Sequence, residues 1–351
     1  MRKYRRFKIV LIASVMTLVV AAGLIYANRG TLSALGYDLF LSDKVEASFQ
    51  GSYKPLTDRP VVEKPKVSEP FSMLMLGVDA RAKERGRSDT IIYTVIRPDN
   101  GKVLMMSIPR DTYAEIVGKD KQDKITHAYA FGGAEMAVNS VEKLLGAKVD
   151  HYAAINFQGF VKVVDTLGGI SLPIGKDIVN KGAEHEKFTV KANKPSYTGV
   201  EALNYVRYRE DAGGDMARTE RNRVFIEALM HKASSLQQWN KIPEVLDIVG
   251  DNFITDLPPS SMNELAKQFL QTGHEVKSYT LKGDGKRMGK ENLWYYVADE
   301  QDLEAVRATV ALWMNPNTPE DQLVVPGEKD ENKEQSTGTS GVVSDSKQPA
   351  A

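Results

Sequence analysis

Five arginines and no lysine fall within the stretch Tyr205–Arg223, which reads YVRYREDAGGDMARTERNR. They are Arg207, Arg209, Arg218, Arg221 and Arg223. A guanidinium group grips phosphate oxygens in pairs, whereas an ammonium group acts as a point charge. The cluster therefore indicates geometric recognition of phosphate. Acidic neighbours such as Glu220 and Glu227 support the alternative interpretation, a solvated helix face with mixed charge.

The two halves of this stretch flank Gly213-Gly214, where the backbone can turn and bring both sets of arginines together. Asp215 lies between the halves and is the candidate acid or base. A helix is expected over Met216–Leu236, and its apolar face, which includes Phe225, must turn inward. The polar residues that extend this face toward the helix N-terminus are Arg218, Arg221 and Asn222. We therefore expect arginines in a partly buried place, at the helix end that attracts anions.

A second group of charged residues borders the first three strands expected in the chain. These strands are Phe71–Leu76, Thr90–Ile96 and Val103–Ile108. Between the last two, Asn100-Gly101 is a strong hairpin signal. Asp89 and Arg110 are almost equidistant from that turn, so they should lie side by side at one end of the sheet. Asp79 reaches the same end if the first strand runs parallel to the third, and loops at strand ends are where open α/β sheets bind ligands.

The carboxylates of Asp79 and Asp89 suit a hard divalent cation that prefers oxygen ligands. Magnesium takes one or two carboxylates and completes its coordination with water and substrate phosphates. A pyrophosphate substrate would therefore fit Mg²⁺ here, with Mn²⁺ as the alternative metal. The competing interpretation is a pair of salt bridges. In it, Asp79 would bind Arg81, and Asp89 would bind Arg87 or Arg110.

Composition limits the classes of function that remain. The chain has 351 residues, enough for one large domain or two ordinary ones. Its formal net charge is zero, which argues against a nucleic-acid-binding protein, because such a protein needs a basic field. It has no cysteine, so disulfides and thiolate metal sites are excluded. The histidines show no zinc-ligand spacing, and the chain has no Gly-x-Ser-x-Gly nucleophile elbow.

The N-terminus indicates a membrane anchor. Met1–Lys8 is basic, and Ile9–Tyr26 then runs eighteen residues without a charge. This run is long enough to span a bilayer and longer than most cleavable signal cores. The basic flank predicts a single-pass protein of the cell membrane, with residues 1–8 cytoplasmic and the folded part extracellular. A cleaved signal peptide is the competing interpretation, since Ala21-Ala22-Gly23 offers small residues.

The rest of the chain divides into three segments behind the anchor at residues 9–26. Residues 27–70 are expected to form an extracellular spacer, extended where prolines recur between Ser52 and Pro70. Residues 71–325 form the folded domain. Residues 326–351 have almost no large apolar side chain, which predicts a disordered tail.

Helical and strand patterns alternate along the folded domain. Helices are expected at Phe131–Leu145, Phe157–Leu167, Thr198–Val206, Met216–Leu236, Met262–Leu270 and Asp302–Trp313, and further strands at Val149–Asn156 and Val276–Leu281. This pattern predicts a single layered α/β domain with a mixed central sheet flanked by helices, behind one transmembrane helix. Gly283–Lys290 (GDGKRMGK) resembles a phosphate-binding loop. It has one residue too many before its last Gly-Lys, and Glu291 follows where Ser or Thr is required, so we expect a turn.

Five motifs, in this order, resemble the LytR–CpsA–Psr (LCP) family. They are LGVDAR (Leu76–Arg81), RSDT (Arg87–Thr90), SIPRDT (Ser107–Thr112), VDTLGGI (Val164–Ile170) and RYREDAGGDMARTERNR (Arg207–Arg223). The resemblance covers roughly Phe71–Ser235, and the layout is similar to that of the teichoic-acid-ligating members of Gram-positive bacteria. It implies an α/β domain whose sheet and helices enclose an apolar pocket for a polyprenyl chain.

The resemblance also implies a magnesium-dependent phosphotransferase that acts outside the cytoplasmic membrane. Such enzymes move an anionic glycopolymer, often wall teichoic acid, from an undecaprenyl-pyrophosphate carrier to a muramic-acid hydroxyl of peptidoglycan. A new phosphodiester forms. For this protein, hydrolysis of the pyrophosphate is a candidate side activity, in which water replaces the acceptor. The alternative is a non-catalytic polyprenyl-pyrophosphate-binding protein that regulates cell-wall assembly or transcription.

By motif, Asp79 and Asp89 match the family's magnesium-binding carboxylates. Asp215 matches an aspartate proposed as the base that activates the acceptor hydroxyl. The arginines that match the pyrophosphate-binding set are Arg87, Arg110, Arg207, Arg209 and Arg218, to which we add Arg221, and Arg110 is expected to act in catalysis as well. Asn222 is a departure, because many members have glutamine there and asparagine is shorter.

Overall fold

The computed structural model describes residues 41–59, 68–79, 86–181, 187–208, 214–233, 241–273 and 275–328, together with residues 36, 38 and 39. The membrane anchor predicted over residues 9–26 lies outside these ranges, as do Arg81, Arg209 and the tail from residue 329. Within these ranges, no helix has the length and apolar character needed to span a bilayer.

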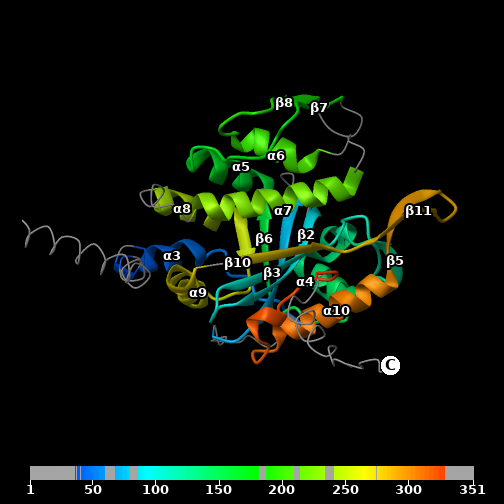
Figure 1. Ribbon diagram of the computed structural model, residues 1–351, viewed down its shortest axis with the longest axis horizontal. Coiled ribbons are helices and arrows are strands. Elements are labelled where there is room, and N and C mark those ends of the chain that lie inside the picture. Colours follow the sequence, from blue (N-terminus) through cyan, green and yellow to red (C-terminus); the bar gives the residue numbers. More distant parts are fainter. Residues whose placement is uncertain are drawn as a thin grey trace, which may run out of the picture.

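A six-stranded sheet forms the centre of the domain, in the order β10-β3-β2-β1-β6-β9 (Figure 1). Its strands are β1 (Phe71–Asp79), β2 (Arg87–Arg97), β3 (Lys102–Ser107), β6 (His151–Asn156), β9 (Phe253–Thr255) and β10 (Glu275–Thr280). The pairs β1–β6 and β3–β10 are parallel, and the other neighbouring pairs are antiparallel. The predicted mixed α/β sheet is therefore confirmed.

The β2–β3 hairpin turns where Asn100-Gly101 predicted it. Gly101 has a φ of +67°, a conformation that favours glycine. A Cβ atom at this position would lie 2.3 Å from the carbonyl oxygen of Gly273. Because β1 and β3 are both antiparallel to β2, they run in the same direction. The ends of β1 and β3 and the start of β2 therefore lie at one end of the sheet, as expected.

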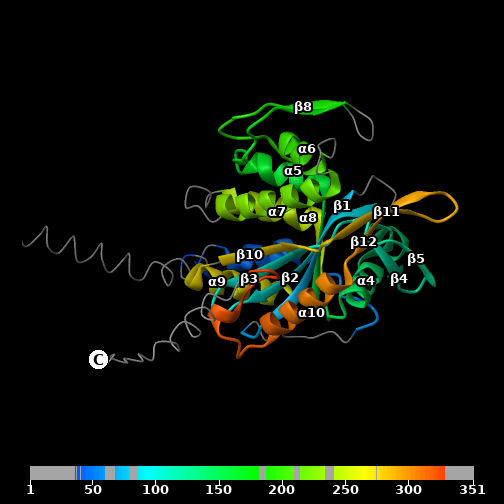
Figure 2. The same cartoon turned by 45° about the vertical axis from the view of Figure 1, so that its right-hand side comes forward.

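Helices cover both faces of the sheet (Figure 1, Figure 2). They are α3 (Ser42–Phe49), α4 (Thr126–Leu145), α5 (Phe157–Thr166), α6 (Gly199–Arg207), α7 (Gly214–Ala233), α8 (Ile242–Asn252), α9 (Pro259–Thr272) and α10 (Glu300–Met314). Alternate residues of β1, such as Leu74 and Leu76, pack with α4 and α10 on one face. Met73 and its neighbours pack with α7 and α9 on the other face. Helices α5 and α6 stack with α7 in a further cluster, beneath the ribbon of β7 (Ile178–Asn180) and β8 (Phe188–Val190).

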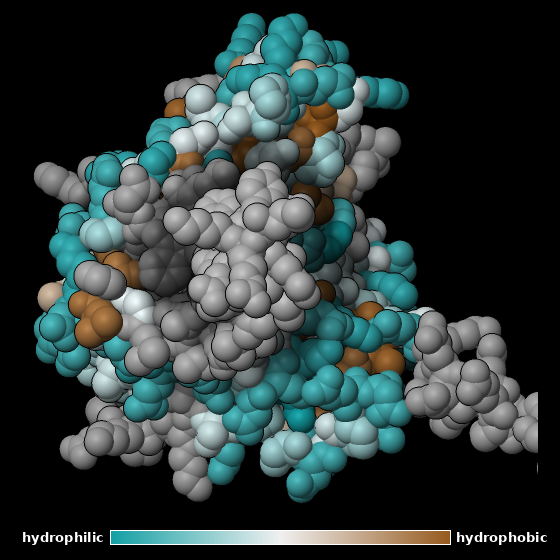
Figure 3. All heavy atoms as spheres, turned by 60° about the vertical axis from the view of Figure 1, so that its left-hand side comes forward, coloured by the Kyte–Doolittle hydropathy of each residue, from teal (hydrophilic) through white to brown (hydrophobic). Residues whose placement is uncertain are grey.

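The segment before β1 belongs to the folded body. Val45 and Phe49, at i, i+4 spacing on α3, are buried against α8 and α9. Downstream of α3, the backbone N–H of Lys54 donates to the carbonyl oxygen of Thr255 at 2.7 Å. Residues 41–59 therefore pack against the domain upstream of the predicted boundary at Phe71, in a region expected to be a spacer that is extended from Ser52. Viewed from the side of α3, the described surface is mainly hydrophilic, with hydrophobic residues in separate patches (Figure 3).

Gly283–Met288 forms strand β11, so the turn predicted there was wrong. It pairs with β12 (Leu293–Ala298), and the chain reverses over residues 289–292. The glycines of β11 allow the two strands of this ribbon to approach each other closely. A Cβ atom at Gly283 would lie 2.2 Å from the carbonyl oxygen of Val297, and one at Gly285 would lie 2.8 Å from the indole nitrogen of Trp294. A second short ribbon joins β4 (Tyr113–Ile116) to β5 (Lys121–Lys124).

Candidate active site

Asp89 is the extra residue of a β-bulge between β1 and β2. Gly77 pairs with Thr90 and Val78 pairs with Ser88, so Asp89 lies opposite no residue of β1. A bulge redirects the side chains that follow it. Here it allows the consecutive residues Asp89 and Thr90 to line the same hollow beside α7, whereas Val78 packs in the core on the α4 face.

The expected neighbours at this end of the sheet do meet. Arg110 forms an ion pair from Nη1 to Oδ1 of Asp89, and both side chains are about four-fifths buried or more, at 15% and 16% exposed. Nε of Arg110 also lies 3.6 Å from Oδ2 of Asp111. The salt bridge that was the competing interpretation for Asp89 is thus present. Its Oδ2 makes no hydrogen bond to any residue that the structure describes, so a further ligand could still bind there.

Asp79 ends β1 and lies opposite Arg87 in the β1–β2 ladder, where Arg87 is exposed. Oδ2 of Asp79 lies 3.9 Å from Nη2 of Arg207, the last residue of α6. The guanidinium of Arg207 in turn stacks over the ring of Phe157, 5.4 Å from its centroid. Charged residues separated by more than a hundred positions in the sequence therefore meet beside β1.

The polar niche is a small hollow at this junction. It is lined by Asp89, Thr90, Phe157, Val206, Arg207, Arg218 and Asn222. These residues come from β2, α5, α6 and α7. Arg218 is only 3% exposed, which confirms that the first turns of α7 carry an arginine into a buried place. A guanidinium group binds phosphate oxygens in pairs, so an arginine in the wall of this hollow suits an anionic ligand.

The start of α6 is fixed by a capping box formed by Thr198 and Glu201. The backbone N–H of Glu201 donates to Oγ1 of Thr198 at 3.3 Å, and the backbone N–H of Thr198 donates to Oε2 of Glu201 at 3.0 Å. Burial alone would raise the pKa of Glu201. Hydrogen bonds from Nζ of Lys194 and from Thr198 outweigh burial and hold that pKa below its usual value. The box positions the helix that ends in Arg207.

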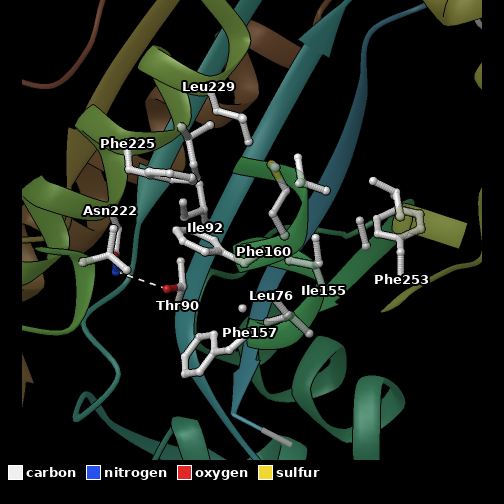
Figure 4. Close-up of a pocket in the computed structure, with 17 residues that line it drawn as sticks. Leu76, Thr90, Ile92, Ile155, Phe157, Phe160, Asn222, Phe225, Leu229 and Phe253 are labelled. Atoms are coloured by element: carbon white, nitrogen blue, oxygen red, sulfur yellow. Dashed lines mark hydrogen bonds between the residues drawn. The ribbon is translucent and has the colours of Figure 1, made fainter. Parts of the chain in front are cut away.

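An apolar cavity of about 310 Å³ adjoins the niche. Figure 4 shows Phe160, Phe225, Leu229 and Phe253 pointing into it from α5, α7 and the start of β9. The rings of Phe160 and Phe225 stack with centroids 4.2 Å apart. Four residues line both the cavity and the niche, namely Thr90, Phe157, Val206 and Asn222. The two hollows therefore share a wall, which suits a ligand with an anionic head and an apolar tail.

Two of the arginines of α7 have other surroundings. Arg221 was expected in the pyrophosphate-binding set, but it donates from Nη2 to the carbonyl oxygen of Tyr208 and stacks over that ring, 5.3 Å from its centroid. It is absent from the lining of the niche. Arg223 forms ion pairs with Glu220 and Glu227. For this residue the alternative interpretation, a solvated helix face with mixed charge, is therefore correct.

Two predicted site residues lie partly or wholly outside the described part of the chain. Asp215 is the second residue of α7, so its backbone lies at the helix N-terminus near the niche arginine Arg218, and its side chain lies outside the described part. Arg209 lies outside the described residues altogether. The cation–π contact of Phe157 with Arg207 was not predicted from the sequence. The position of Phe157 directly after strand β6, at the same sheet end as Asp79, was the available signal.

Within the described ranges, no three His, Asp or Glu side chains gather closely enough to hold a metal ion. Asp79 and Asp89 remain as two carboxylates on neighbouring strands, and both are partly accessible. An oxygen-only set of one or two carboxylates fits Mg²⁺ when phosphate and water supply the remaining ligands. The residues present therefore fit this metal.

Known proteins share this architecture. The sequence profile of the LytR_cpsA_psr family matches residues 40–311. The polyisoprenyl-teichoic acid–peptidoglycan teichoic acid transferase TagU of Halalkalibacterium halodurans is 34% identical over 297 residues, which cover 82% of this chain and 95% of that protein. The crystal structure of TagV from Bacillus subtilis is 30% identical, with a TM-score of 0.60, over 70% of this chain and 98% of that one.

A structure of TagT bound to LI-WTA has a TM-score of 0.61 and 28% identity, over 75% of this chain and 99% of that chain. The family profile spans β1 to α10 and so includes every described residue of the niche and the cavity. The chain therefore belongs to the LytR_cpsA_psr family.

Proposed function

We propose that this protein transfers an anionic cell-wall glycopolymer of the teichoic-acid class from an undecaprenyl-pyrophosphate carrier to peptidoglycan. The observation that carries this proposal is the wall shared by the apolar cavity and the arginine-containing niche. The apolar lining of the cavity suits part of a polyprenyl chain, whose diphosphate would then lie beside Arg207 and Arg218. TagU of Halalkalibacterium halodurans bears a name that describes this reaction, which supports the same conclusion.

The reaction breaks the bridging P–O bond of the diphosphate. An acceptor hydroxyl of peptidoglycan attacks the phosphorus that carries the glycopolymer, and the lipid leaves with the other phosphate. Such a transfer depends on positioning and charge neutralisation. Arg207 and Arg218 bind the diphosphate in the niche, and the family resemblance adds Arg87, Arg110 and Arg209 to the pyrophosphate-binding set. Arg110 offsets the charge that develops in the transition state, and Asp215 accepts the proton of the attacking hydroxyl.

Asp79 and Asp89 would hold Mg²⁺, or Mn²⁺, beside the diphosphate. The bound ion would supply positive charge that neutralises the pyrophosphate and the departing lipid phosphate. Arg110 remains paired with Asp89 in this arrangement, so it orients that carboxylate as well as binding phosphate.

We further propose that residues 9–26 anchor the protein in the cell membrane, with the N-terminus cytoplasmic and the domain outside. The uncharged run and its basic flank support this topology. It places the catalytic domain on the side of the membrane where peptidoglycan lies. Pyrophosphate hydrolysis is expected as a side activity when water takes the place of the acceptor.

The test is transfer by the full-length protein in liposomes with Mg²⁺, a polyprenyl-pyrophosphate glycan and peptidoglycan oligomers. We expect polymer-linked peptidoglycan and an equal amount of polyprenyl phosphate. Binding of the donor without either product would favour the alternative of a regulatory binding protein. Asp215→Asn separates the two classes in cells, because it should abolish complementation by an enzyme and leave a binding protein functional.

A further inference from the structure

The β11–β12 ribbon projects from the domain beside the end of the sheet that carries the niche (Figure 1, Figure 2). The backbone N–H of Tyr296 in β12 donates to the carbonyl oxygen of Asp111 at 2.9 Å, and Thr112 forms a β-bridge with Tyr296. Asp111 directly follows Arg110, whose guanidinium is paired with Asp89 of the niche. Two consecutive residues, Arg110 and Asp111, thus make the contacts to the niche and to the base of the ribbon.

Aromatic rings lie near this contact between the ribbon and the segment Asp111-Thr112. The rings of Tyr295 in β12 and Tyr113 in β4 pack edge to face, with centroids 5.0 Å apart. Nζ of Lys124 lies 5.8 Å from the Tyr295 centroid and 2.9 Å from Oδ1 of Asp111. Tyrosine rings of this kind offer apolar faces and a polar tip, which suits the mixed surface of a sugar or polyol.

The outer part of the ribbon is basic. Lys286, Arg287 and Lys290 are exposed, and Glu291 is the one acid among residues 286–292. No described carboxylate forms an ion pair with Lys286 or Lys290, and Arg287 donates to the backbone oxygen of Asn292. In the β11–β12 register Lys286 lies opposite Tyr295, so a cation and the aromatic pair share one face of the ribbon.

We propose that this ribbon is a subsite for the glycopolymer part of the donor, a chain of repeating phosphodiesters. This inference rests on the proposed function. The polymer leaves the diphosphate in the niche, passes over Asp111 and Thr112, and continues along the ribbon. Polyol or sugar units contact Tyr113 and Tyr295, and successive phosphates meet Lys286 and Lys290. Charge complementarity selects the phosphodiester polymer over the peptidoglycan acceptor, which has no repeating phosphates.

The test compares two donors with the full-length protein. One carries a long glycerol-phosphate polymer on the polyprenyl pyrophosphate, and the other carries only a disaccharide. The variant is Lys286→Glu/Lys290→Glu, which leaves Arg287 and its contact within the ribbon intact. The control is Lys143→Glu/Lys148→Glu, which makes the same charge change on side chains that are 62% and 85% exposed, at α4 and the loop after it.

We expect the ribbon variant to raise the KM for the long donor about tenfold, with kcat unchanged and with less salt dependence than the wild type. The disaccharide donor and the control variant should behave as the wild type does. An unchanged KM for the long donor would overturn the proposal, as would a rise confined to the peptidoglycan acceptor, which would make the ribbon an acceptor site. Turnover of the disaccharide donor by the wild type tests the proposed function separately, so the two failures can be told apart.

Discussion

Nδ2 of Asn222 in α7 donates a hydrogen bond to Oγ1 of Thr90 in β2, at 3.1 Å (Figure 4). Both residues line the apolar cavity and the polar niche, and Asn222 is 7% exposed. The bond therefore ties α7 to the sheet at the point where a polyprenyl tail would meet its diphosphate. It also gives Asn222 a role that does not require direct contact with phosphate.

Removing either partner of this bond should weaken both the fold and donor binding. Asn222→Ala or Thr90→Val is expected to lower the free energy of unfolding by about 1–2 kcal/mol, because a buried polar group loses its partner. The KM for the lipid-linked donor should rise more than kcat falls. Urea unfolding of both single variants and the double variant gives the coupling between them. We expect a coupling energy of roughly 1 kcal/mol, and strictly additive effects of the two substitutions would contradict a direct interaction between Asn222 and Thr90.

Arg110→Ala should lower kcat/KM by about 10²–10³-fold, as expected when a group that stabilises transition-state charge is lost. It should also cost about 1–3 kcal/mol of stability, since Asp89 keeps a largely buried charge without its partner. Adding Asp89→Asn should restore the stability and leave transfer lost. Thermal unfolding and a transfer assay separate the two effects. The control is Arg223→Ala, which removes an ion-paired arginine outside the niche. It should lower the free energy of unfolding by about 1 kcal/mol or less and leave transfer near normal.

Asp79→Asn should weaken binding of the divalent ion. Because one of two carboxylates loses its charge, we expect Mn²⁺ binding in the presence of pyrophosphate to weaken by about tenfold or more, read by electron paramagnetic resonance. Transfer should require correspondingly more Mg²⁺ and stop with a chelator. Asp177→Asn is the matched control, since Asp177 pairs with Lys191 beside β8, away from the niche. Equal Mn²⁺ affinity in Asp79→Asn and wild type would remove Asp79 from the metal site.

The capping box of α6 predicts a pH-dependent contribution to stability. The folded-state pKa of Glu201 is held below the usual 4.5 by Lys194 and Thr198, against the effect of burial. Its contribution is therefore present above pH 4.5 and is lost as the pH falls through the folded-state pKa. Glu201→Gln should be about 1 kcal/mol less stable than the wild type at neutral pH, and the difference should vanish in acid. A difference that grows on acidification would contradict this assignment.

Local signals in the sequence predicted the frame of the site. The turn chemistry of Asn100-Gly101 fixed the β2–β3 hairpin, and the equal offsets of Asp89 and Arg110 from that turn correctly placed them together. The i, i+4 spacing of Arg218 and Asn222 on the apolar face of α7 likewise predicted a buried arginine. These features depend on residues close in sequence or on one periodicity.

Other features depend on packing between distant segments and escaped prediction. The bulge that turns Asp89 toward the niche is set by the register of two strands together. Arg221 turns to Tyr208 because the end of α6 offers it a carbonyl and a ring. The family resemblance implied an apolar pocket, but Phe160 and Phe225 could equally belong to an ordinary core, so the sequence did not assign them to its lining. The glycines of β11 favoured a turn in the sequence, whereas in the structure they allow Trp294 and Val297 of β12 to approach the strand closely.

The most direct test of the whole account is a crystal structure with Mg²⁺ and a short polyprenyl pyrophosphate. We predict the diphosphate within hydrogen-bonding distance of Arg207 and Arg218, the metal ion bound by Asp79 and Asp89, and the tail between Phe160 and Phe225. A diphosphate bound away from these arginines, or a tail outside the cavity, would contradict the central claim that one wall joins the two sites.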